Sequence, residues 1–129
     1  MSLKLSQNNV IPYQYYSENT GLTPITTQVI LDNTGGIKGS DVVSAFLIAT
    51  TFNYTGINVS PVSEQAGINW RVSLDNIIWS EFVTPPAMDA LLVDQNIPIY
   101  FAAVVANDGT VITGNYIQCK VRIIATENP

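Results

Sequence analysis

The stretch that most constrains the fold runs from residue 97 to residue 125 and combines two hydrophobic patterns. Residues 97–106 are almost continuously apolar and rich in branched and aromatic side chains, as in a central strand. Residues 107–110 (Asn-Asp-Gly-Thr) have turn chemistry, because Gly and Asn tolerate the positive φ of a tight reversal. In residues 117–125, apolar and polar side chains alternate, which is the period of a strand with one wet face. The stretch predicts a long β-hairpin with a central first strand and a half-exposed second strand.

A second hairpin is predicted over residues 68–82. Apolar and polar residues alternate over residues 68–74, Asp75-Asn76 supplies a two-residue turn, and residues 77–82 return as a strand. Trp70 lies on the apolar face and is expected in the core. Trp79, on the return strand, is either a core residue or an exposed platform.

Further strands make the chain all-β. Residues 25–31 and 42–52 are rich in β-branched residues and predict strands. Residues 53–67 predict a long loop, which could include a short strand at 57–59. Residues 88–93 predict either a short strand or a turn of helix. About seven antiparallel strands, without a convincing helix or a sequence repeat, predict an immunoglobulin-like or fibronectin-like β-sandwich, with a jelly roll as the alternative. Tyr100 falls where such folds place a tyrosine corner.

The N-terminal segment differs from the rest of the chain. It is polar, is interrupted by prolines, and contains Tyr13, Tyr15 and Tyr16. We expect residues 1–24 to form an extended arm and residues 25–129 to form the sandwich domain. Tyrosine suits interfaces because it buries much area with few rotatable bonds, so the three tyrosines are candidate partner-binding residues. The alternative is a leader whose tyrosines lie back on the domain.

Composition and charge limit the classes of partner. The chain is 47% hydrophobic and 12% charged, which excludes a disordered protein and fits a surface largely covered by neighbours. Its net charge is −5, and five scattered basic residues are too few to bind nucleic acid. No segment approaches the ~20 apolar residues of a membrane span. The N-terminus lacks signal-peptide features, so we expect synthesis in a cytoplasm and no membrane partner.

The sequence contains no catalytic signature. The chain has no histidine, which removes the commonest general base and most transition-metal sites. Its carboxylates lie mostly in turns, and a weak Ca²⁺ site from loop residues such as Asp32 and Asp41 stays open. The lone Cys119 is expected to be a buried small hydrophobe. We expect no enzyme, no cofactor and no catalytic or metal-binding residue.

Two aromatic residues are candidates for ligand binding. An exposed Tyr54 or Trp79 would stack on sugar faces, with Asn and Asp side chains of the loops adding hydrogen bonds. The alternative is that both are core aromatics.

Three segments together resemble a known family: SLDNIIWSEF after Trp70, IPIYFAAVVANDGTV, and the closing QCKVRIIA. They resemble small Ig-like β-sandwich virion proteins of tailed bacteriophages. The resemblance implies a capsid decoration (auxiliary head) protein that docks on the capsid lattice, with the major capsid protein or neighbouring copies as partners. A tail-associated or host-attachment carbohydrate-binding module is the alternative, with a surface glycan as its ligand. The expected location is the virion, and a homo-oligomer is an open option. Removal of residues 1–20 is expected to leave the sandwich folded but to weaken docking.

Overall fold

The computed structural model describes residues 3–16, 29–30, 38–39, 42–63, 66–84, 95–105, 115–116 and 119–128. Within them the chain is all-β, every strand pair is antiparallel, and no helix occurs. The strands are β1 (Leu3–Ser6), β2 (Val29–Ile30), β3 (Lys38–Gly39), β4 (Val43–Ala49), β5 (Asn53–Val62), β6 (Ile68–Ser73), β7 (Asn96–Val105), β8 (Asn115–Tyr116) and β9 (Lys120–Asn128). Since β2, β3 and β8 have two residues each, six strands form the framework, against about seven expected. The predicted all-β, antiparallel class is confirmed.

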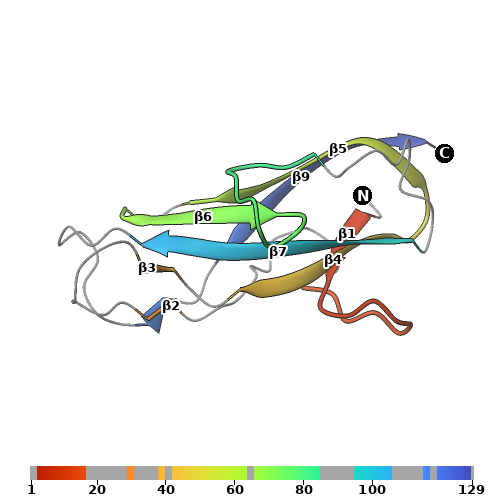
Figure 1. Ribbon diagram of the computed structural model, residues 1–129. Helices are drawn as coiled ribbons and strands as arrows, with labels where there is room; N and C mark the ends of the chain where they lie inside the picture. The colour runs from red at the N-terminus through yellow and green to blue at the C-terminus, as the bar shows by residue number, and fades with distance from the viewer. Residues whose placement is uncertain are drawn as a thin grey trace.

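The main sheet has the order β1-β4-β7-β6, and β3 pairs with the far end of β7 on the side of β4 (Figure 1). The predicted central strand is confirmed, because β7 pairs with β4 on one side and β6 on the other. Ile97, Ile99, Phe101 and Ala103 of β7 are buried on its core face. Tyr100 therefore lies mid-strand on the opposite face, between its partners Ser44 and Ser73, and the predicted tyrosine corner is wrong.

The predicted long hairpin over residues 97–125 is also wrong. Instead of pairing with β7, β9 pairs with β5 in a separate two-stranded sheet, while β8 pairs with β2. Hydrophobic alternation identified β9 as a strand with one wet face, and Val121, Ile123 and Ala125 do pack against the core. Alternation does not encode the partner of a strand, however, and the prediction paired sequence neighbours. The predicted turn at residues 107–110 lies outside the described residues.

Residues 53–62 form the ten-residue strand β5, which contains the optional short strand at 57–59 but replaces most of the loop predicted over 53–67. Its inward residues Tyr54 and Ile57 are three positions apart, because the β5–β9 register shifts between Thr55 and Asn58. Gly56 lies in this bulge with φ of 59°, a left-handed conformation that glycine adopts without strain. The bulge breaks the alternation by which a strand is recognised in a sequence.

The predicted hairpin after β6 is only partly correct. The chain does return antiparallel to β6, but through a single bridge between Val72 and Ser80. Of the two turn residues, only Asn76 has a positive φ, of 60°, so the two-residue primed turn is wrong. A second bridge, between Val83 and Val59, connects the same returning segment to β5. Residues 80–83 thereby join the main sheet to the β5–β9 sheet.

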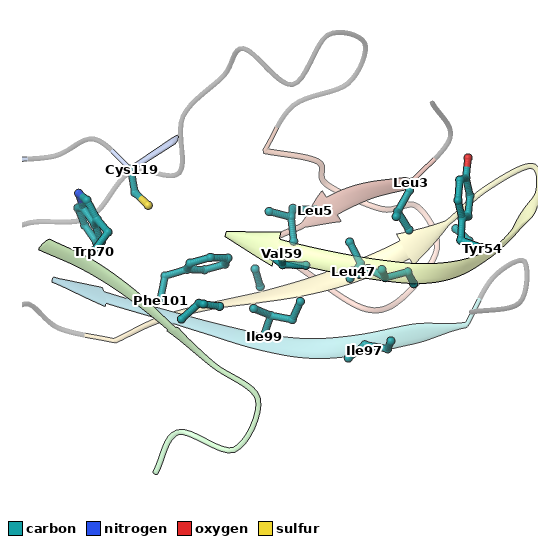
Figure 2. Packing of buried hydrophobic residues seen from close by; sticks show 14 of the residues in the cluster. Leu3, Leu5, Leu47, Tyr54, Val59, Trp70, Ile97, Ile99, Phe101 and Cys119 are labelled. Atoms are coloured by element: carbon teal, nitrogen blue, oxygen red, sulfur yellow. The ribbon is translucent and has the colours of Figure 1, made fainter. Parts of the chain in front are cut away.

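Both sheets contribute to one hydrophobic core (Figure 2). Leu47 and Ile99 of the main sheet and Val59 of β5 are fully buried in it. Trp70, 5% exposed, and Cys119, 1% exposed, also belong to this cluster, which confirms both as core residues. The two sheets therefore pack their apolar residues into a single cluster.

The N-terminal residues belong to the main sheet. β1 pairs with β4 from Leu3↔Ala49 to Ser6↔Phe46, and Leu3 and Leu5 are buried in the core. The expected extended arm is therefore wrong for β1, and so is the start of the sandwich domain at residue 25. Leu3-Lys4-Leu5 alternates like a strand, but three residues are too few to predict one, and the polar residues that follow favoured an arm. Residues 17–28 lie outside the described part of the chain, as do residues 88–93 and most of the strand predicted over 25–31.

Candidate functional site

Exposed apolar side chains gather in two ordered loops of the molecule. The β1 loop (residues 7–14) follows β1, and the β6 loop (residues 74–79) follows β6. Large exposed hydrophobic residues of the described chain are Val10, Ile11, Val42, Ile77, Ile78, Phe82 and Ile124. Four of these seven lie in the two loops.

The β1 loop is fixed by hydrogen bonds around Ser6 and Asn8. The fully buried Ser6 hydroxyl donates to Asn8 Oδ1 (2.9 Å) and accepts from the Asn8 amide (3.2 Å). Asn8 Oδ1 also accepts from the Gln14 amide (2.8 Å), and Asn8 Nδ2 donates to the Pro12 carbonyl (3.2 Å). The Gln7 amide donates to the Gln14 carbonyl (2.7 Å) and closes the base of the loop. Its tip, Val10 and Ile11, is 62% and 74% exposed.

The three candidate tyrosines lie at the base of this loop. Tyr13 and Tyr15 have ring centroids 6.0 Å apart, and Lys4 Nζ lies 4.7 Å from the centroid of Tyr15. Tyr16 packs against the core and donates its hydroxyl to the Ser44 carbonyl (3.2 Å). Burial raises the pKa of Tyr16 above its ordinary value. Tyr16 thus follows the alternative in which the tyrosines lie back on the domain, and the apolar tip beyond them was not predicted.

The β6 loop is built on Ser73 and Asp75. The fully buried Ser73 hydroxyl donates to Asp75 Oδ1 (2.9 Å) and accepts from the Asn76 amide (3.0 Å). Asp75 Oδ1 accepts from the amides of Ile77 and Ile78, both at 2.9 Å. The amides of Ile78 and Ile77, followed by the Ser73 hydroxyl, hold the pKa of Asp75 below its usual 3.8. The loop presents Ile77 and Ile78, which are 78% and 73% exposed.

The two candidate ligand platforms have different environments. Tyr54 is fully buried and donates its hydroxyl to Glu127 Oε1 (2.9 Å), so the exposed platform predicted there is wrong. Its inward orientation follows from the Gly56 bulge. Trp79 is half-buried and does not belong to the core cluster of the described residues, so it remains a candidate platform.

The thiol, the ion pair and the acidic residues of the described chain show no arrangement typical of a reactive or metal-binding site. Burial raises the pKa of the Cys119 thiol to about 12, so the reactive thiolate is not formed near neutral pH. Arg71 Nη1 lies 3.2 Å from Glu81 Oε1. Among the described residues, no three His, Cys, Asp or Glu side chains form a group able to hold a metal ion. Asp32 and Asp41, named for a weak Ca²⁺ site, lie outside those residues.

The sequence does contain a signal for each loop tip, but residues 77–78 were assigned to a return strand and residues 10–11 to the N-terminal arm. In both loops two aliphatic residues directly follow Asx residues, which favour turns. An apolar pair beside such a turn indicates either a strand start or an exposed tip, and only the structure distinguishes the two.

Comparisons with protein-family models, with curated proteins and with solved structures found no match to this chain. Over the residues that the structure describes, no helix has the length and hydropathy needed to cross a membrane.

Proposed function

We propose that this chain is a non-enzymatic structural protein of a bacteriophage virion that docks on the capsid lattice as a decoration protein. The observation that carries the proposal is the pair of loops whose exposed tips are aliphatic while their bases are fixed by hydrogen bonds. Exposed apolar residues on a fixed scaffold suit a protein–protein contact, because little conformational entropy is lost when they are covered. The low charge of the chain and its resemblance to virion proteins support the same partner class.

We also propose that the fold is an Ig-like sandwich. The shared core between the main sheet and the β5–β9 pair supports this proposal, as does the placement of consecutive strands in different sheets. An experimental structure with residues 85–94 and 106–114 in place tests it. Additional strands beside β9 are expected, and an uncovered β5–β9 pair would contradict the fold.

The test of the function is the location and binding of the chain. Particles purified from lysates of the source phage are expected to contain the chain at a fixed copy number per capsid protein, measured by quantitative mass spectrometry. Recombinant chain is expected to rebind saturably to particles assembled without it. Particles that lack the chain, or that do not take it up, would contradict the proposal.

The second candidate is a carbohydrate-binding, host-attachment module, and the half-exposed Trp79 is the observation that favours it. Aromatic faces stack on sugar rings, and Trp79 lies outside the core cluster. A glycan array with the purified chain tests this candidate, with Trp79→Ala as the variant expected to lose any signal. An array without signal would exclude Trp79 as a sugar platform.

A further inference from the structure

The β1 and β6 loops share one sequence motif. Residues 6–11 read Ser-Gln-Asn-Asn-Val-Ile, and residues 73–78 read Ser-Leu-Asp-Asn-Ile-Ile. Both follow the pattern Ser-x-Asx-Asn-aliphatic-Ile. The shared motif is six residues long, much shorter than the repeated units that the sequence lacks.

The shared residues make the same kind of hydrogen bonds in both loops. Each serine is fully buried at the end of its strand, and its hydroxyl donates to the Asx side chain two residues later, at 2.9 Å in both cases. Each Asx Oδ1 then accepts backbone amides further along the loop, from Gln14 in one case and from Ile77 and Ile78 in the other. Both loops end in exposed tips of equal chemistry, since Ile11 and Ile78 are 74% and 73% exposed.

The two loops also occupy corresponding places in the main sheet. β1 and β6 are its outermost long strands, and each is antiparallel to its inner neighbour (Figure 1). Because β4 and β7 are antiparallel as well, β1 and β6 run in opposite directions. The two loops therefore leave the sheet on opposite sides of the β4–β7 pair and in opposite directions along the strands.

We propose that the two loops are equivalent docking elements that engage the same apolar pocket on two copies of one partner protein, so that this chain bridges neighbouring subunits. Two tips of the same chemistry fit two identical pockets, and identical pockets recur in a repeating lattice. This inference rests on the proposed function and adds to it the contact residues and the two-point attachment.

The chemistry of the tips favours a protein pocket. The tip residues Val10, Ile11, Ile77 and Ile78 carry no charge, and the one charged side chain within residues 7–14 and 74–79 is the acidic Asp75. Attraction to an anionic bilayer requires Lys or Arg, whereas this chain has a net charge of −5. The same negative charge disfavours association with a second copy of the chain, so the partner of this proposal is a different protein with a neutral, apolar pocket.

The experiment places a photo-crosslinking amino acid at position 11 or position 78 of the full chain, bound to particles. The control position is 124, because Ile124 is an aliphatic residue of β9 that is 58% exposed and outside both loops. Positions 11 and 78 are expected to cross-link to the same peptide of one virion protein, and position 124 to none.

Every other outcome overturns the bridging inference in a recognisable way. Equivalent docking would be contradicted by cross-links from only one loop, from all three positions or from none. It would also be contradicted if the two loops cross-linked to different peptides or to this chain itself. In each of these cases the chain would still be a virion protein. Absence of the chain from particles would remove both the inference and the proposed function.

Binding strength gives an independent readout. Ile11→Ser and Ile78→Ser are each expected to weaken binding to particles by about 10²–10⁴-fold, the loss that follows when one of two linked contacts is removed. The double variant is expected to show no measurable binding, and Ile124→Ser to bind normally. Unchanged unfolding midpoints would show that the variants fold, because all three side chains are exposed. Wild-type binding by either single variant would contradict two-point attachment.

Discussion

Tyr54 is held at both ends, by the core around its ring and by Glu127 at its hydroxyl. Tyr54→Phe keeps the ring and removes the hydroxyl, so we expect the free energy of unfolding to fall by about 1 kcal/mol. Tyr54→Ala also removes the buried ring and is expected to cost about 3–5 kcal/mol. Urea denaturation of the purified variants measures both. A neutral Tyr54→Ala would show that Tyr54 is exposed in solution.

The Asp75 carboxylate gives the β6 loop a dependence on pH. Its pKa lies below 3.8 in the folded chain, so its stabilising contribution is fully present above about 3.8 and is lost as pH falls through the folded pKa. We expect the amide NMR signals of Ile77 and Ile78 to titrate below pH 3.8, and Asp75→Asn to abolish that titration. A midpoint at or above 3.8 would contradict the hydrogen bonds to this carboxylate.

Among the elements, β1 changes the expected effect of N-terminal truncation. Removal of residues 1–20 was expected to leave the domain folded, but it deletes the buried Leu3 and Leu5 and uncovers the edge of β4. Leu5→Ala alone is expected to lower the free energy of unfolding by about 2–5 kcal/mol. Val10→Ala, an exposed aliphatic control on the same segment, is expected to change it by less than about 0.5 kcal/mol. Equal stabilities of the two variants in urea would show that β1 is not part of the core.

Individual strands were more predictable from the sequence than their partners. β6 and β9 followed from the alternation of their side chains and β7 from its continuous apolar run, and burial of Trp70 and Cys119 followed with them. Strand pairing was not predictable, because the same alternation fits any neighbour of suitable length. Only residues 57–59 of β5 were offered as a strand, because one glycine bulge shifts the inward side of β5 by a residue.

The candidate site was less predictable than the fold, since it depends on hydrogen bonds within loops. The tyrosines of residues 13–16 were selected for their size, although Tyr16 packs against the core and the exposed tip is Val10 and Ile11. The buried Ser6 and Ser73 that fix the loops resemble any surface serine in a sequence. Their burial and their Asx partners become visible only in three dimensions.

In the whole molecule, the two sheets share one core and are joined by residues 80–83, so we expect them to unfold together. Fluorescence of Trp70, isolated by Trp79→Phe, reports on the main sheet, and far-UV circular dichroism reports on all strands. Both signals are expected to give the same urea midpoint. Separate midpoints would show that the β5–β9 sheet unfolds independently.

The separation of β5 from β9 along the chain has a consequence for synthesis. Tyr54 and Glu127, which face each other across this sheet, are 73 positions apart. At about 5–20 residues per second, β5 is translated on the order of 4 to 15 seconds before its partner. During that interval its backbone edge and apolar side chains are open to other nascent chains. Rapid codons between the two strands would shorten this exposure, so translation speed in this segment is expected to affect the yield of folded protein.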